Sequence, residues 1–239
     1  MELIIIGAIL AVAACVQGAI GFGLGMLAAP LIALIAPELL PGTVLLLAFV
    51  LSFAIFIRER GEIKWSVVGW TSLGRVPGSL VGAVLVAILP VSGLSLVLAA
   101  AVILGVVVSL VGWRPGYSLG SASVAGFAAG ILGTSTSIGG PPLALILRDL
   151  SPSAVRGTMG AAFVAGTALS VVFLWAGGSL SAEQWKAALV LLPAVAVGFM
   201  LSSLVNRFIQ SRHLYVGSVV LSLVGAVVVI IDSIFGLLA

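Results

Sequence analysis

Charged and chemically reactive residues are scarce in this sequence. Only 7% of its 239 residues are charged, and it contains one cysteine and one histidine. A lone cysteine excludes an intramolecular disulfide, and together these two residues offer no cluster of metal ligands. A net charge of +3 in so apolar a chain says little about nucleic acid. We therefore expect no cofactor, no metal site and no nucleic-acid partner.

Hydrophobic residues, by contrast, dominate. They make up 62% of the chain, and the mean hydropathy of +1.39 is far outside the range of soluble domains. The sequence predicts an all-α polytopic membrane protein with one transmembrane domain over residues 1–239. The first apolar run starts at Leu3 without a basic region before it, and Gly18 to Gly25 does not resemble a cleavage site, so we expect no removable signal peptide.

Proline, glycine and charged residues divide the chain into ten hydrophobic segments. A full span needs about 20 residues, so the second, sixth and seventh segments are too short, and the first is borderline. We interpret the short segments as half-helices beside breaks, either re-entrant or spanning. The segments are 2–17, 24–36, 41–57, 66–89, 92–112, 118–132, 139–148, 154–176, 184–206 and 213–237.

The basic residues predict an orientation, because cytoplasmic loops carry an excess of lysine and arginine. If each segment reverses the chain, eight of the ten basic residues fall on one side and only Lys186 on the other, with Arg75 inside a segment. Both termini would then be extracytoplasmic, in a bacterial cytoplasmic membrane. The eight are Arg58, Arg60, Lys64, Arg114, Arg148, Arg156, Arg207 and Arg212.

The two halves of the chain repeat each other, one set of matches at a separation of 112 residues and another at 120. Each half holds five segments, an odd number, so residues 118–239 would enter the membrane inverted relative to residues 1–117. Inverted repeats with broken helices are a recurring transporter architecture, with the substrate near the midplane. The pairs are Gly18, Gly21, Pro30 and Leu31 with Gly130, Gly133, Pro142 and Leu143, and Trp65, Gly78, Leu94 and Gly105 with Trp185, Gly198, Leu214 and Gly225.

One stretch, Gly130 to Pro142, has a composition that does not suit a lipid-facing helix. It combines four consecutive hydroxyl residues, four glycines and two prolines. Backbone that leaves a helix within a membrane needs partners in the protein or in a water-filled cavity. Gly18 to Gly25 is the corresponding glycine-rich stretch of the first half. We expect breaks at Gly18 to Gly25 and at Gly133 to Gly140, both facing one site at the bilayer centre.

These paired motifs resemble the TauE/SafE family of sulfite and organosulfonate exporters, also called the TSUP family. The resemblance rests on Gly18-Ala19-Ile20-Gly21-Phe22-Gly23 with Pro30, on Gly130 to Pro142, and on similar hydrophobic spacing along the chain. It implies export, and sometimes uptake, of small anions such as sulfite, thiosulfate and sulfoacetate. Thr134 to Ser137 stand where some relatives carry a glycine run, which favours hydroxyl donors to an oxyanion.

Arg75 is the strongest candidate for binding the anion. It would lie about 16 Å deep if its helix begins after Lys64, and no carboxylate is expected at that depth. A central arginine costs roughly 2.5–3.5 kcal/mol and normally faces a partner or cavity, and its planar fork suits a sulfonate or carboxylate. The alternative is an interfacial helix over residues 62–70, with Arg75 reaching toward water.

Further candidates lie at the two breaks. Pro141 and Pro142 suit a first helical turn, so the residues before them would offer amides and a positive dipole end. Alternatively, serine, threonine and glycine serve helix packing. Gln17 could reach the ligand or satisfy a freed carbonyl. The predicted substrate-binding residues are Arg75, Thr134, Ser135, Thr136, Ser137, Gly139, Gly140, Gln17, Gly21 and Gly23.

Together these patterns favour a carrier that exports a small sulfur-containing or carboxylate anion, driven by the membrane potential. Uptake, or a channel for the same anions, remains an alternative. An intramembrane hydrolase using Ser135 or Ser137 lacks a base, because the one histidine, His213, falls in a predicted surface loop. A scaffold subunit is the least specific alternative, and a homodimer is compatible with the sequence.

Overall fold

The computed structural model describes residues 1–111, 118–208 and 227. These residues are almost entirely helical and contain no strand. The predicted segment 213–237, with His213, lies outside the described residues except for Val227. The elements are α1 (Glu2–Ile20), α2 (Leu24–Ala33), η1 (Pro37–Leu39), α3 (Gly42–Arg58), η2 (Arg60–Glu62), α4 (Trp65–Ile88), α5 (Val91–Val111), α6 (Leu119–Thr136), α7 (Gly140–Leu147), α8 (Pro152–Ala176) and α9 (Ala182–Phe208).

Helix boundaries follow the sequence signals closely. The Ser118 hydroxyl accepts from the Ser121 amide and starts α6 with a reciprocal capping box. Ser151 caps α8, with Pro152 in the first turn. Among the described helices, α1, α4, α8 and α9 are long and apolar enough to span a membrane, whereas α2 and α7 have 10 and 8 residues. Helix α6 continues to Thr136, beyond the predicted end at 132, but with 18 residues it is not among these four helices.

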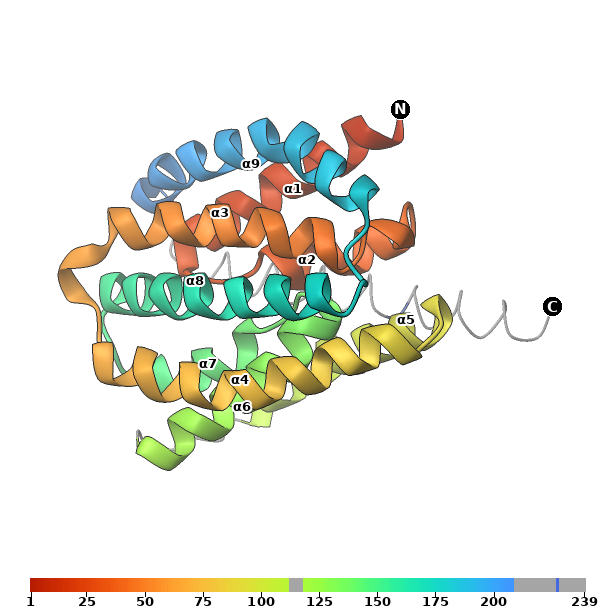
Figure 1. The fold of residues 1–239 in the computed structure, drawn as a ribbon. Coiled ribbons are helices and arrows are strands. Elements are labelled where there is room, and N and C mark those ends of the chain that lie inside the picture. Colours follow the sequence, from red (N-terminus) through yellow and green to blue (C-terminus); the bar gives the residue numbers. More distant parts are fainter. Residues whose placement is uncertain (112–117, 209–226, 228–239) are drawn as a thin grey trace.

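The helices pack in pairs that place the two short helices inside. Figure 1 shows α9 beside α1 at one face, α3 beside α8 in the middle, and α4 beside α6 at the other face. Nearly every residue of α2 is buried, and so are Gly140, Pro141, Leu143, Ile146 and Leu147 of α7. The long helices therefore form a shell around α2 and α7.

Glycines allow α4 and α6 to touch backbone to backbone. A Cβ at Gly78 of α4 would collide with the Phe127 carbonyl of α6, and a Cβ at Gly126 of α6 would collide with the backbone of Thr71. Close approach of this kind is how membrane helices gain packing energy where lipid supplies no hydrophobic drive. The α4–α6 pair thus packs closely on one side of α7.

Side-chain contacts assign the loops to two opposite ends of the bundle. At one end, Glu62 of η2 accepts hydrogen bonds from Ser151 and Ser153 before and in α8, at 2.7 and 2.8 Å. These bonds lower the pKa of the Glu62 carboxyl. At the other end, the Gln184 side chain of α9 donates to the Glu38 carbonyl of η1 at 2.9 Å. The arginine-containing stretches 58–64 and 148–156 therefore share one end, hereafter the arginine end, and Lys186 lies near the other.

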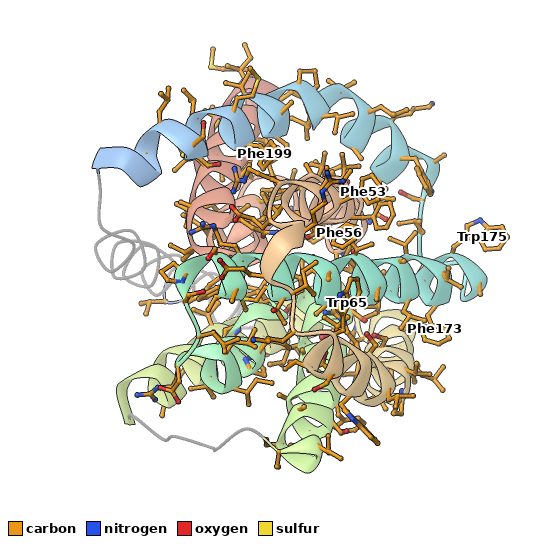
Figure 2. The ribbon with its side chains drawn as sticks, turned by 90° about the vertical axis from the view of Figure 1, so that its left-hand side faces the viewer. Phe53, Phe56, Trp65, Phe173, Trp175 and Phe199 are labelled. Atoms are coloured by element: carbon orange, nitrogen blue, oxygen red, sulfur yellow. The ribbon has the colours of Figure 1, made fainter. Side chains whose placement is uncertain are left out.

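Exposed aromatic side chains mark both ends of the bundle. Trp65 begins α4 at the arginine end, and Trp175 lies in the last turn of α8 at the opposite end, with exposed fractions of 62% and 70%. Figure 2 shows Trp175 projecting away from the helices. Phe56 packs edge-on against Trp65, with ring centroids 6.2 Å apart. Tryptophans at both ends are typical of the two membrane–water interfaces.

The glycine contacts of α6 yield a stability prediction. Gly126→Ala should lower the free energy of unfolding by about 1–3 kcal/mol, because its Cβ would press on the α4 backbone. Gly120→Ala in the same helix is the matched control, since the only atom near that position is the Ser118 hydroxyl at 3.8 Å. Thermal unfolding of the two purified variants tests the difference. Equal melting temperatures would contradict close α4–α6 packing.

Candidate functional site

Two short breaks interrupt the inner helices. After α1, Gly21 and Gly23 adopt φ values of 97° and 130°, and after α6, Ser137 adopts a φ of 65°. The breaks span only residues 21–23 and 137–139. The predicted breaks at Gly18 to Gly25 and Gly133 to Gly140 were therefore too long. Gly18 belongs to α1, where it packs against Ser202 of α9.

Three of the four predicted hydroxyl residues of the second break are helical, because each hydroxyl group has a partner that allows the helix to continue. Ser135 and Thr136 donate to the carbonyls of Ile131 and Leu132, at 2.7 and 2.6 Å. Thr134 forms a 2.7 Å hydrogen bond with Ser170 of α8. Serine and threonine make such bonds to the preceding turn without ending a helix. All three lie outside the cavity described below.

The two breaks contact each other in the interior. A Cβ at Gly25 of α2 would collide with the Ser137 carbonyl, and a Cβ at Gly140 of α7 would lie 2.7 Å from the Phe22 ring. The Ser137 hydroxyl also donates to the Pro41 carbonyl before α3, at 3.1 Å. Segments more than 110 positions apart in the sequence thus meet around one small space.

Arg75 lies in the interior beside this meeting point. Its exposed fraction is 2%, within the continuous helix α4. Therefore the alternative of an interfacial helix over residues 62–70, with Arg75 reaching toward water, does not apply. Among the described residues, no acceptor pairs with its Nε or Nη1 atoms. Its guanidinium carbon lies 5.7 Å from the centre of the Phe163 ring.

Glycines make the space that the guanidinium occupies. A Cβ at Gly133 would come within 2.9 Å of Arg75 Nη2, and one at Gly139 within 3.4 Å. A Cβ at Gly166 of α8 would overlap Nε and the guanidinium carbon. Nη2 therefore faces the second break, and α6 and α8 hold the side chain without giving it a counter-charge.

A cavity of about 30 Å³ lies between the two breaks and Arg75. This volume holds roughly two water-sized groups. It brings together six of the ten predicted site residues: Gln17, Gly23, Arg75, Ser137, Gly139 and Gly140. Gly21 is not among them and packs against Arg156 and Met159 of α8. Phe22, Gly25, Met26, Leu45, Ala48, Ser52, Gly133, Ile138, Phe163 and Thr167 complete the lining.

Gln17 has a structural role at the first break, with a different partner from the freed carbonyl that was predicted. Its side-chain oxygen accepts from the Leu24 amide at 2.9 Å, and its amide group donates to Ser52 at 3.3 Å. It therefore caps the first N–H group of α2, rather than a freed carbonyl. The first turn of a helix leaves its N–H groups without partners inside the helix, which is why a broken helix recruits such a cap.

The start of α7 offers few amide donors. Gly140 is its first residue, and the prolines that follow at 141 and 142 have no N–H group. The Ile138 amide already donates to the Thr136 hydroxyl at 3.3 Å. Gly139 and Gly140 therefore carry the amides that remain at this end, both on the cavity wall.

Sequence reasoning missed Ser52, Phe163 and Thr167 as lining residues. Ser52 and Thr167 are fully or almost fully buried polar residues in apolar helices, and Thr167 donates to the Phe163 carbonyl at 2.6 Å. Isolated serine and threonine are common in membrane helices. Ser52 and Thr167 can be assigned to the site only once the structure shows that α3 and α8 face Arg75.

A second polar cluster lies nearer the arginine end. Glu59 pairs with Arg58 at 3.2 Å and with Arg156 at 2.9 Å. Arg58 also donates to the Gly18 carbonyl of α1 and to Ser202 of α9, and its guanidinium lies 4.6 Å from the Phe199 ring centre. The cluster ties α1, α3, α8 and α9 together beside the first break.

A bundle of apolar helices around two broken half-helices, with a buried arginine between them, defines a membrane-embedded protein of the transporter class. The family model described as sulfite exporter TauE/SafE matches residues 5–229, and the chain belongs to this family. The resemblance found in the glycine motifs is thereby confirmed. No curated protein and no solved structure matches the chain.

The tight fit of Arg75 yields a prediction for α8. Gly166→Ala should displace the guanidinium from the cavity, because the added Cβ would occupy its place. We expect at least a tenfold loss of anion binding, within the range for losing a hydrogen bond to a charged group of about 1.5–3 kcal/mol. Gly69→Ala in α4 is the control, since nothing lies within 4 Å of that position. Calorimetric titration with sulfite measures both, and equal affinities would place the binding group elsewhere.

Proposed function

We propose that the protein is a carrier that exports a small sulfur-containing anion, and that Arg75 binds the charge of this anion. The observation that carries the proposal is a buried guanidinium, beside a cavity between two helix breaks, whose Nε and Nη1 atoms have no hydrogen-bond partner among the described residues. An uncompensated charge in a membrane interior is costly and marks a substrate pathway. Membership of a sulfite exporter family supports the same chemistry.

The small cavity favours a compact anion. A volume of about 30 Å³ is closer to the needs of sulfite, with four heavy atoms, than to those of the larger sulfoacetate. The glycine amides and Arg75 are the groups that would contact its oxygens. Phe163 and Met26 on the wall would exclude water around it.

The membrane potential is a sufficient driving force for this export. Moving one charge through 100 mV is worth about 2.3 kcal/mol, or roughly 50-fold in concentration. An interior negative potential therefore drives a monovalent anion outward without a coupling ion. The cavity is lined by no carboxylate among the described residues, which fits a mechanism without a proton relay.

We further propose that residues 1–117 and 118–239 are inverted repeats that rock against each other. The packing supports this: α1 pairs with α9 as α6 pairs with α4, and α3 lies against α8. Trp65 and Trp185, matched in the sequence, lie in the first turns of α4 and α9 at opposite ends. Alternating exposure of the cavity would follow from relative rotation of the two halves.

A hydrolase gains no support from the described serines. The hydroxyls of Ser135 and Ser137 donate to backbone carbonyls, and neither donates to a basic side chain. An activated nucleophile needs a base within hydrogen-bond reach.

Flux measurements test the carrier directly. In proteoliposomes, sulfite flux should saturate with concentration and increase with an imposed potential, negative on the side from which sulfite leaves. Arg75→Ala should reduce flux at least tenfold, because the charge that attracts the anion is lost, whereas Arg60→Ala, an exposed arginine of η2, should leave it unchanged. Electroneutral flux, or full flux in Arg75→Ala, would refute the mechanism. Flux that never saturates would indicate a channel.

The proposed orientation has its own test. We expect the arginine end to be cytoplasmic and both termini extracytoplasmic. In a Cys15→Ala background, a membrane-impermeant maleimide should label Ala182→Cys in intact cells and Gly61→Cys only after permeabilisation. Both positions are exposed, at opposite ends of the bundle. The reverse labelling pattern would invert the topology.

A further inference from the structure

Charged side chains are scarce around the cavity. Arg75 is the only charged side chain among the described residues that line it. The described helices α2, α6 and α7 contain no ionisable side chain at all. The charges nearest along α3 and α8 are Arg58, Glu59 and Arg156, which pair with one another outside the cavity.

The helix ends at the cavity add little net charge. The positive end of α2 follows directly on the negative end of α1, where the Gly21 amide caps the Gln17 carbonyl. The same order recurs at the second break, where the Ser137 amide caps the Gly133 carbonyl just before α7 begins. Each helix end carries about half a unit charge of opposite sign, so the two ends at each break largely offset each other. The cavity therefore presents close to one positive charge.

We infer that this cavity selects monoanions, and discriminates against dianions and zwitterions carrying the same oxyanion group. The inference rests on the proposed function and adds the charge state of the substrate. A dianion would leave one negative charge uncompensated away from water, which is strongly unfavourable. A zwitterion such as taurine would bring an ammonium group to a lining without a carboxylate. Sulfite would accordingly be carried as its singly protonated form, bisulfite.

Binding to the intact, detergent-solubilised protein separates these charge states. We expect methanesulfonate, a monoanion at every pH near neutrality, to bind with an affinity that does not depend on pH. Sulfate and taurine should bind at least tenfold more weakly. The apparent affinity for sulfite should fall with rising pH, approaching about tenfold per pH unit once the dianion dominates, because only the competent fraction binds.

A designed change of charge provides an independent check. Thr167 lines the cavity, and Thr167→Lys would add a second positive charge there. The ratio of sulfate to methanesulfonate affinity should then rise at least tenfold, whereas Arg60→Ala should leave that ratio unchanged. If Thr167→Lys does not fold, the pH comparison on the unmodified protein still decides the question.

The outcomes distinguish this inference from the function on which it rests. Equal affinity for sulfate and methanesulfonate, or a sulfite affinity that is flat with pH, would overturn monoanion selection and leave the anion carrier standing. Absence of binding by methanesulfonate, sulfite and sulfate alike would overturn the proposed function and this inference with it.

Discussion

The structure depends on one positive charge held in an apolar interior, to which no described residue supplies a counter-charge. Burying Arg75 in this way costs roughly 2.5–3.5 kcal/mol by insertion scales, and the surrounding helices are shaped to tolerate it. Gly133, Gly139 and Gly166 leave the room that its guanidinium fills. Arg75 therefore lies, unpaired by any described residue, beside a small cavity in which a bound anion would supply the counter-charge.

The helix breaks follow from the same requirement. Polar backbone is tolerated at membrane depth only where protein or a lined cavity surrounds it. The long helices provide this surrounding, because they enclose α2 and α7. At the first break Gln17 accepts from the Leu24 amide that begins α2, and at the second break the Ser137 hydroxyl donates to the Pro41 carbonyl before α3. Nearer the arginine end, Glu59 joins two arginines whose contacts connect four helices. Among the described residues, the closely packed helix pairs, the two breaks and the unpaired Arg75 thus occupy distinct places in the bundle.

The helices themselves could be predicted, because hydrophobic runs end at proline, glycine and charge. The residues at which the two breaks begin and end could not be predicted, because serine and threonine occur both in helices and in loops. Thr136 bonds to its own helix, whereas Ser137, one residue later, adopts a left-handed conformation. The burial of Arg75 within α4 could be anticipated from its distance to Lys64 along the helix. Ser52 and Thr167 were not readable, since their place beside the arginine arises from contacts between helices far apart in the sequence.

Much of the cavity wall consists of glycine, at positions 23, 25, 133, 139 and 140. In the proposed function such a wall would offer the anion main-chain amides beside Arg75, and point mutations cannot exchange these amides for another chemistry. A side chain added at one of these positions would fill the cavity and would not change which chemical groups line it. A new substrate preference would consequently evolve by changes in a few side chains, chiefly Arg75, Ser52, Phe163 and Thr167, while the helices around them stay constant.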